Sequence, residues 1–310
     1  RAAYIAGAVG SSNTITDRDF QIPAIGTMAH AYVQSFDSEY DAFLAYAKTY
    51  PKDSVFLVDT YSTLGSGVPN AIKVYQDYLK PNGYTLKGIR IDSGDLTYLS
   101  KKSRELLDAA GLNQTKITVS NSLDEYLIRE LVEQGAQIDA FGVGERLITS
   151  KSDSVFGGVY KLAALKQDGV WVPKMKLSDN VVKTTNPGVK KLFRLFDKTT
   201  NNAIADVVTL DYETIDETKA FLLFDPNFPW KQKKVSNFKV VSLLEPIFIQ
   251  GKLVYKKPTL KDIRSFHQAQ MATLWDEVKR FENPHPYYVD LSQDLWKMKQ
   301  QLIEQYSKKA

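Results

Sequence analysis

The residues of this chain best suited to chemistry are a histidine and a pair of carboxylates that follow apolar runs. His30 closes the motif Gly26–His30, and Asp92 and Asp95 close the motif Arg90–Asp95. A histidine can act as an acid, a base, a metal ligand or a phosphoryl acceptor. Paired carboxylates suit a hard cation such as Mg²⁺ or a substrate hydroxyl, although an aspartate here can equally cap the following helix. The position of these residues directly after apolar runs predicts a polar site at the ends of strands, where loops begin.

Arg90 is the second unusual feature, because it stands inside a strand-like run between Ile89 and Ile91. In a strand its side chain points to the opposite face from these two neighbours. A guanidinium in that position needs a partner. Asp92 lies two residues on and shares its face, so the two can form a structural ion pair. Alternatively, the guanidinium receives a phosphate or a carboxylate of a substrate.

Several weaker candidates follow other apolar runs or lie in short polar loops. Glycines at a strand end let backbone N–H groups approach a phosphate, but they suit a tight turn equally well. The Ser-Asn-Ser stretch after the run over 117–119 and the loop over 11–14 offer small polar side chains of the same kind. The candidate substrate-binding residues of this group are Asn13, Ser120, Asn121, Gly142 and Gly144.

The elements that must position these residues are alternating strands and helices. Apolar runs alternate with amphipathic stretches, of which 96–110 and 123–132 place their apolar residues on one helical face. Consecutive strand–helix units predict a parallel sheet. If such a sheet closes into an α/β barrel, the chemistry lies at the carboxyl ends of the strands. The strand-like runs cover 22–25, 55–58, 88–91, 117–119 and 138–141.

From about residue 158 the pattern changes to an alternation with period two, which is typical of antiparallel strands. Two amphipathic helices are expected at 259–281 and 292–307. We therefore predict an α/β barrel core over 1–165, a mainly antiparallel β segment over 166–258 and C-terminal helices over 259–310. The alternating runs cover 158–162, 170–177, 238–244 and 246–254.

The composition narrows the function classes. The 310 residues are 43% hydrophobic and 25% charged, with a net charge of +4 from 40 basic and 36 acidic residues. That balance argues against a nucleic-acid-binding protein. The absence of cysteine excludes disulfides, thiolate zinc sites and a cysteine nucleophile. No apolar stretch is long enough to span a bilayer, and a cytoplasmic location is expected.

Taken together, the motifs resemble those of the nicotinate phosphoribosyltransferase family along nearly the whole chain. The order in which they occur makes the resemblance specific. The stretches that carry it are Arg1–Tyr4, Gly26–Ala31, Phe56–Tyr61, Arg90–Leu96, Ser120–Ser122, Phe156–Leu162, Asn283–Tyr287 and Val289–Ser292.

The resemblance implies an incomplete α/β barrel of the type II phosphoribosyltransferase kind. It implies transfer of phosphoribosyl from phosphoribosyl pyrophosphate to nicotinate, which gives nicotinate mononucleotide and pyrophosphate for NAD biosynthesis. ATP hydrolysis is expected to be coupled through a phosphohistidine, with Mg²⁺ assisting. A cytoplasmic homodimer is expected.

By the same resemblance, Thr27 is part of the nicotinate pocket and His30 is the phosphoryl acceptor. Arg90 contacts a substrate phosphate or carboxylate, and Asp92 lies near the ribose or the pyrophosphate. On the carboxylate pair itself, Mg²⁺ is assigned to Asp92 and Asp95. The substrate-binding residues completing the site are Asn13 and Ser120 together with the phosphoribosyl cradle of Asn121, Gly142 and Gly144.

Two departures from the family pattern leave alternatives open. Glu145 and Arg146 stand where relatives often carry a small residue after Gly144. Family chains also begin with a further N-terminal region that carries an aromatic residue for the pyridine ring, which this sequence is expected to lack. A nicotinamide-using relative, or a non-catalytic barrel that binds a phosphorylated metabolite, are the alternative functions.

Overall fold

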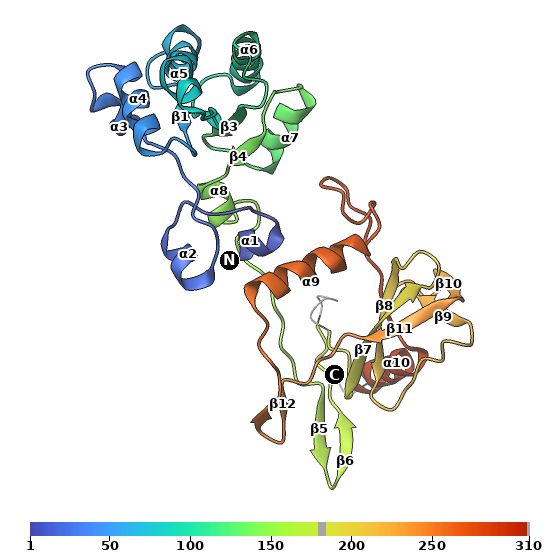
Figure 1. Cartoon of the computed structure of the whole chain (residues 1–310). Coiled ribbons are helices and arrows are strands. Elements are labelled where there is room, and N and C mark those ends of the chain that lie inside the picture. The colour runs from blue at the N-terminus through green and yellow to red at the C-terminus, as the bar shows by residue number, and fades with distance from the viewer. Residues whose placement is uncertain (179–183, 309–310) are drawn as a thin grey trace. The chain divides into compact units, whose positions relative to one another are not determined.

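The computed structural model of this chain describes residues 1–178 and 184–308, which form two compact units (Figure 1). The first unit is Arg1–Phe156 and the second is Gly157–Ala310. The first contains a four-stranded parallel sheet, and the strands of the second are mainly antiparallel. The three-part division at residues 165 and 258 stays a prediction.

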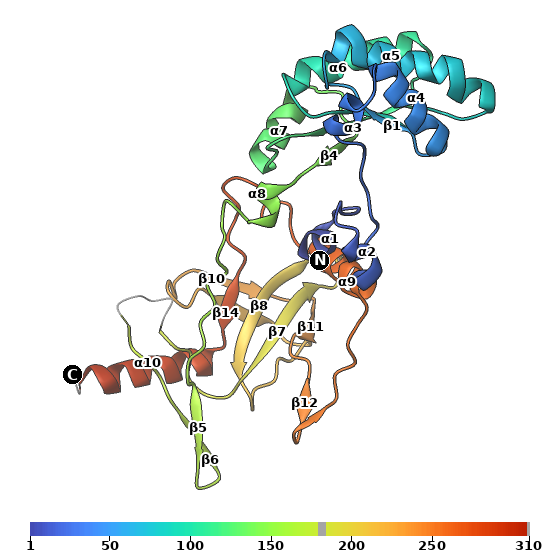
Figure 2. The ribbon, with the colours of Figure 1, turned by 90° about the vertical axis from the view of Figure 1, so that its left-hand side faces the viewer.

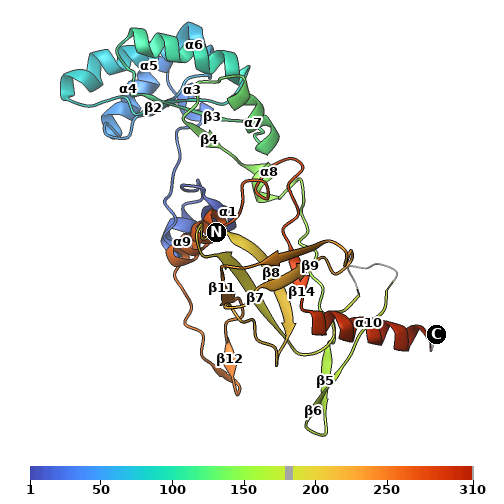
Figure 3. The same ribbon diagram turned by 90° about the vertical axis from the view of Figure 1, so that its right-hand side faces the viewer.

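The first unit is built on a four-stranded parallel sheet whose strands follow one another in chain order. Helices lie between consecutive strands and cover one face of the sheet (Figures 2 and 3). This is the strand order of an α/β barrel, and the sheet is open over the described residues. The strands are β1 (Val55–Leu57), β2 (Gly88–Ile91), β3 (Lys116–Ser120) and β4 (Ala140–Gly142).

These strands form because their apolar side chains are buried between layers. Phe56, Ile89, Ile91, Ile117 and Val119 are fully buried in one core. Leu57 pairs with Arg90, which in turn pairs with Thr118 on the next strand. Arg90 is half-buried between two buried isoleucines, as the alternation predicted. The register therefore places the charged side chain of Arg90 in the middle of the sheet, beside Thr118.

The helices between the strands begin at aspartate caps. Asp95 accepts a hydrogen bond from the Tyr98 N–H at the start of α6 (Leu96–Ala109), and Asp124 accepts one from the Leu127 N–H at the start of α7 (Glu125–Glu133). Both helices were predicted within two residues. The remaining helices of this part are η1 (Thr63–Gly67), α5 (Val68–Val74), η2 (Tyr75–Leu79), η3 (Lys80–Asn82) and α8 (Glu145–Ile148).

The strand predicted at 22–25 is wrong. The run makes a single bridge between Ser11 and Ala24, and Pro23 within it lacks an N–H for a sheet ladder. His30 is therefore the first residue of a helix and does not follow a strand. The helices around this run are α1 (Ala2–Ala6), α2 (Ile15–Phe20), α3 (His30–Gln34) and α4 (Glu39–Thr49).

The second unit contains a four-stranded sheet in the order β11-β7-β8-β14. β14 is parallel to β8, and the other pairs are antiparallel. Leu195, Val207 and Phe238 are buried in its core. Helix α10 (Gln293–Ser307) contacts β8 (Figure 2). The strands are β7 (Lys190–Asp197), β8 (Ala203–Leu210), β11 (Phe238–Ser242) and β14 (Val289–Leu291), beside the pair β9 (Phe221–Phe224) and β10 (Gln232–Val235).

Two hairpins and one helix complete this unit. The hairpins turn at Asp168-Gly169 and at Gln250-Gly251, where all four residues have a positive φ, whereas the predicted strand at 158–162 is absent. The helix expected at 259–281 ends early, because Trp275 packs against Tyr287 and Tyr288 and the chain turns back. These elements are β5 (Ala164–Gln167), β6 (Val170–Pro173), β12 (Phe248–Ile249), β13 (Lys252–Leu253) and α9 (Leu260–Ala272).

No helix within residues 1–178 or 184–308 has the length and apolar character that crossing a membrane requires.

Candidate functional site

Arg90 organises a polar cluster at the carboxyl edge of the parallel sheet. Each of its nitrogen atoms donates to a different side chain. Nε donates to Ser120 Oγ at 2.8 Å, Nη1 to Thr27 Oγ1 at 3.0 Å and Nη2 to Asp92 Oδ1 at 2.9 Å. The structural ion pair that the sequence left open is therefore present. It also ties β2 and β3 to the loop before α3.

Asp92 stays ionised in this environment. Burial by itself would raise the pKa of the carboxyl group, but the hydrogen bonds from Ser120 and Arg90 outweigh burial. The guanidinium charge and the nearby imidazole act in the same direction, so the pKa of Asp92 lies below its ordinary value. The cluster thus holds a fixed negative charge beside a fixed positive one.

Asp59 lies behind this pair and is nearly inaccessible to solvent. Its side chain is 2% exposed, and it lies two residues after the end of β1. Oδ2 accepts hydrogen bonds from the Asp92 N–H at 3.0 Å and from Ser93 Oγ at 2.6 Å. Oδ1 is buried and has no hydrogen-bond partner among the described residues. A buried carboxylate oxygen without a hydrogen bond is costly, and here it faces the histidine.

His30 lies at the open side of the cluster, with 38% of its side chain exposed. Its Nε2 is 3.9 Å from Asp59 Oδ1 and 3.7 Å from Asp92 Oδ2. Its Nδ1 is 3.1 Å from Thr60 Oγ1. The two carboxylates favour a proton on Nε2, which leaves the lone pair of Nδ1 directed at the hydroxyl group. Such an imidazole can accept a proton or an electrophile at Nδ1.

The structure brings five of the predicted site residues into this one cluster, namely Thr27, His30, Arg90, Asp92 and Ser120.

Gly142 lies next to the cluster on β4. It pairs with Ser120 across the sheet, and a Cβ placed on it would lie 3.2 Å from the Ser120 Cβ. A side chain at this position would push on the serine that donates to Asp92. Close packing at the sheet edge is therefore one reason for a glycine here.

The other candidates make local contacts. Asn13 accepts a hydrogen bond from the Ile15 N–H within its own turn. Asn121 has a φ of 94° and accepts from the Ser122 hydroxyl, which gives the chain a strained turn directly after β3. A Cβ on Gly144 would meet no atom within 4 Å. None of these three hydrogen-bonds to the Arg90 cluster in the described structure.

The two side chains after Gly144 differ in their contacts. Arg146 forms an ion pair with Asp124, the residue that caps α7. It therefore joins α8 to the start of α7. Glu145 is the first residue of α8 and is exposed.

The carboxylate pair assigned to Mg²⁺ does not fit a resident metal site. Asp95 accepts a hydrogen bond from the Tyr98 N–H as the cap of α6, and Asp92 Oδ1 is occupied by Arg90 and Ser120. Within the described ranges, no group of three or more His, Asp or Glu side chains is arranged to hold a metal ion.

Asp59, Thr60 and Ser93 belong to the cluster but are absent from the residues predicted to form the site. The signal for the first two was present, because Asp59 and Thr60 directly follow an apolar run, in the same position as the residues after β2. Nothing in the sequence shows that Asp59 is buried.

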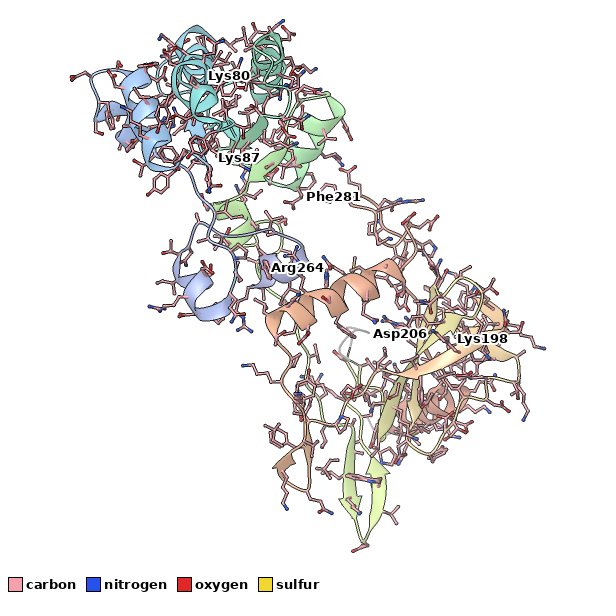
Figure 4. The ribbon with its side chains drawn as sticks, viewed as in Figure 1. Lys80, Lys87, Lys198, Asp206, Arg264 and Phe281 are labelled. Carbon is pink, nitrogen blue, oxygen red and sulfur yellow. The ribbon has the colours of Figure 1, made fainter. Side chains whose placement is uncertain are left out.

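A second polar cluster lies in the sheet of the second unit. Arg194 donates to both carboxylate oxygens of Asp206, at 2.7 and 2.9 Å, and the Tyr287 hydroxyl donates to the same carboxylate at 2.9 Å. Figure 4 labels Asp206 there. Burial raises the pKa of Tyr287 well above its ordinary value. The charges of Arg194 and Asp206 are paired with each other, so we interpret this cluster as structural.

Comparisons with known proteins agree with the motifs. Residues 4–207 match the model of the "Nicotinate phosphoribosyltransferase (NAPRTase) family", and residues 189–299 match that of the "Nicotinate phosphoribosyltransferase C-terminal domain". The nicotinate phosphoribosyltransferase of Bacillus subtilis is 44% identical over 305 residues, which are 98% of this chain and 62% of the relative. That of Dictyostelium discoideum is 33% identical and covers 96% of this chain and 58% of the relative.

Solved structures show the same relationship. The crystal structure of human nicotinic acid phosphoribosyltransferase superposes with a TM-score of 0.77 at 27% identity, over 97% of this chain and 66% of the human chain. The nicotinate-nucleotide pyrophosphorylase of Pyrococcus furiosus, at a TM-score of 0.61 and 23% identity, shows a shared fold. The chain spans about three fifths of the length of the curated relatives named above. On the family match over 4–207 and the 44% identity, this chain belongs to the nicotinate phosphoribosyltransferase family.

Proposed function

We propose that this chain carries the reaction centre of an enzyme that transfers phosphoribosyl from phosphoribosyl pyrophosphate to nicotinate. The observation that carries the proposal is the convergence of His30, Arg90 and Asp92 on one sheet edge, in front of the buried Asp59. Membership of the family supports it. The products would be nicotinate mononucleotide and pyrophosphate.

In the proposed transfer, the lone pair of the pyridine nitrogen forms a bond to C1 of the ribose. The bond from C1 to the pyrophosphate oxygen breaks, and its electron pair leaves with pyrophosphate. Positive charge develops on the ribose as this bond lengthens. The ionised Asp92 can stabilise that charge, and Arg90 can hold a phosphate or carboxylate of the substrates.

His30 is proposed to couple ATP hydrolysis to this transfer. The lone pair of an imidazole nitrogen attacks the γ-phosphorus of ATP, and ADP leaves with the electron pair of the broken P–O bond. Because Asp59 and Asp92 favour the proton on Nε2, we expect Nδ1 to accept the phosphoryl group. Thr60, whose hydroxyl lies 3.1 Å from Nδ1, would then orient the ring.

Mg²⁺ is proposed to arrive with the substrates. This ion keeps several waters and binds readily to substrate phosphates, so it needs few protein ligands. Asp92 Oδ2 would be the carboxylate oxygen that contacts this ion, because Oδ1 already accepts from Arg90 and Ser120, and Asp95 caps α6. A cytoplasmic homodimer remains part of the proposal, on the strength of the family resemblance.

The experiment that tests the proposal is the intact mass of the purified chain before and after incubation with Mg-ATP. We expect a gain of one acid-labile phosphoryl group in the native chain and no gain in His30→Ala. His285→Gln is the control, because that histidine belongs to the second unit and contacts the Pro286 carbonyl. A folded native chain that gains no phosphoryl group, or an unchanged gain in His30→Ala, would contradict the coupling role.

Substrate choice is tested separately. Nicotinate should be turned over in preference to nicotinamide, with stimulation by ATP. A preference for the amide would contradict the proposed substrate and favour the nicotinamide-using alternative.

A further inference from the structure

Gly67 lies against the backbone that leads into Asp59, and a side chain cannot fit between the two. It is the last residue of η1, is buried, and has the backbone conformation of a helix, which any residue can adopt. A Cβ placed on Gly67 would lie 1.8 Å from the carbonyl oxygen of Val58 and 2.6 Å from its carbonyl carbon. Glycine is therefore required here by the close approach of two backbone segments.

The carbonyl group of Val58 stands directly before the two residues that face the imidazole of His30. Asp59 Oδ1 is 3.9 Å from His30 Nε2, and Thr60 Oγ1 is 3.1 Å from Nδ1. The N–H of Val58 donates to the Arg90 carbonyl oxygen at 3.0 Å. β2 therefore holds the N–H of this residue, while the glycine limits the movement of its carbonyl group.

The turn that carries Gly67 is itself fixed at both ends. The Ser62 carbonyl oxygen accepts hydrogen bonds from the N–H groups of Ser66 and Gly67, at 3.0 and 2.9 Å. Beyond the turn, Val68 and Ala71 of α5 are fully buried in the core of the first unit. Because a packed core resists displacement, α5 cannot easily withdraw to make room for a side chain.

We propose that Gly67 is a positioning residue that holds Asp59 and Thr60 against the imidazole of the reaction centre. The least costly way to admit a side chain is a rotation of the peptide group between Val58 and Asp59, since it changes only two backbone dihedral angles. That rotation would move the Asp59 carboxylate away from Nε2 and the Thr60 hydroxyl away from Nδ1. The catalytic meaning of this arrangement rests on the proposed function, whereas the arrangement itself does not.

Imidazole ¹⁵N chemical shifts test the proposal without measuring turnover. The sequence contains three histidines, so the signals of His30 are those that disappear in His30→Gln. The spectra are recorded on the full chain without ATP or Mg²⁺, at a pH at which the ring is neutral. In the native chain we expect the proton on Nε2 and, at Nδ1, the shift of a nitrogen that accepts a hydrogen bond.

Gly67→Ala should move the Nδ1 signal towards the value of free histidine, because the hydrogen bond from Thr60 is lost. Thr60→Val sets the scale, and we expect Gly67→Ala to show most of the change seen there. Gly65→Ala is the matched control from the same turn. A Cβ on Gly65 would lie 2.7 Å from Ser62 Oγ, which can rotate away, so the signals of His30 should stay unchanged.

An Nδ1 shift in Gly67→Ala equal to that of the native chain would overturn the proposal, and so would an equal change in Gly65→Ala. If Gly67→Ala does not fold, Ser62→Ala replaces it, since this variant removes the exposed hydroxyl that accepts from the Gly65 N–H. We then expect a smaller change in the same direction, and unchanged signals would overturn the proposal. Failure of the proposed function is distinguishable, because it would abolish phosphoryl gain in the native chain without altering these shifts.

Discussion

At the scale of single residues, Arg90 holds the polar cluster together because each of its nitrogen atoms serves a different acceptor. A planar guanidinium presents these donors in a fixed fork, whereas a lysine concentrates its charge on one nitrogen. The geometry of the cluster thus requires arginine rather than any cation.

Arg90→Lys tests this requirement. A single ammonium group cannot reproduce the three separate hydrogen bonds of the guanidinium to Thr27, Asp92 and Ser120, so some of these acceptors lose their donor. We expect the rate of transfer to fall on the order of 10²-fold, the scale of one lost donor in a preorganised site. The measurement is kcat/KM for nicotinate. Arg18→Lys, at an exposed arginine paired with Asp19, should leave the rate unchanged. An unimpaired Arg90→Lys enzyme would show that charge alone suffices.

The residues of this cluster differ in how far sequence could identify them. His30, Arg90 and Asp92 were predicted because a histidine beside a threonine and an arginine inside an apolar run are unusual. Asp59 stands out as a polar residue after an apolar run, but it is not among the predicted site residues, because its burial depends on packing between β1 and β2. The roles assigned to these residues stay predictions.

At the scale of elements, the Asp95 carboxylate has two interpretations, as the cap of α6 and as a Mg²⁺ ligand, and substitutions distinguish them. As the cap of α6 it accepts the Tyr98 N–H, and asparagine can do the same. Asp95→Ala should lower the free energy of unfolding by about 1 kcal/mol, and Asp95→Asn by much less. Urea unfolding of both variants, with and without Mg²⁺, makes the comparison. If both variants instead lose the same free energy of unfolding, and lose it only when Mg²⁺ is present, Asp95 is a metal ligand.

Asp290 gives β14 a dependence on pH. Burial and the nearby Asp225 carboxylate raise the pKa of Asp290 from 3.8 to about 6. The folded state therefore keeps a proton that the unfolded chain releases, so stability falls as pH rises from about 4 to about 6 and stays lower above that range.

Asp290→Asn should remove this penalty, since the amide is neutral at every pH. We expect the variant to be more stable than the native chain by about 3 kcal/mol at pH 7, from about two pKa units, and equally stable near pH 4. Thermal unfolding across this pH range is the measurement, with the exposed Asp211→Asn as control. If the stability of Asp290→Asn relative to the native chain does not increase from pH 4 to pH 7, the prediction is wrong.

Helices and strands with a clear hydrophobic period were predicted well. The predictions failed where tertiary contacts determine whether an element forms or where it ends. The parallel strands and α6 have buried faces that their sequences display. The run over 22–25 is apolar, but within residues 1–178 and 184–308 it makes only the single bridge between Ser11 and Ala24. The end of α9 depends on Trp275 meeting aromatic residues that follow ten or more positions later, which no local pattern reveals.

At the scale of the whole molecule, two units with separate cores are joined through a stretch of exposed apolar residues. Phe156 and Tyr160 are 101% and 100% exposed and lie outside any helix or strand. Limited digestion with chymotrypsin should therefore cut first at these two residues and yield two protected fragments. The fragments are identified by mass. First cuts inside the parallel sheet or the β7–β8 sheet would contradict the division at Phe156.

The strand order of the two sheets has a consequence for how the chain is made. Strands β1 to β4 pair with their immediate successors, so each contact closes a short loop and can form soon after its residues are synthesised. The second sheet differs, since β14 pairs with β8 across about 80 residues. During translation we expect the first unit to fold early. The edge of β8 that pairs with β14 stays unpaired until β14 has been synthesised. Until then, the free edge of β8 can pair with a wrong strand, and the pairing of β14 removes that edge.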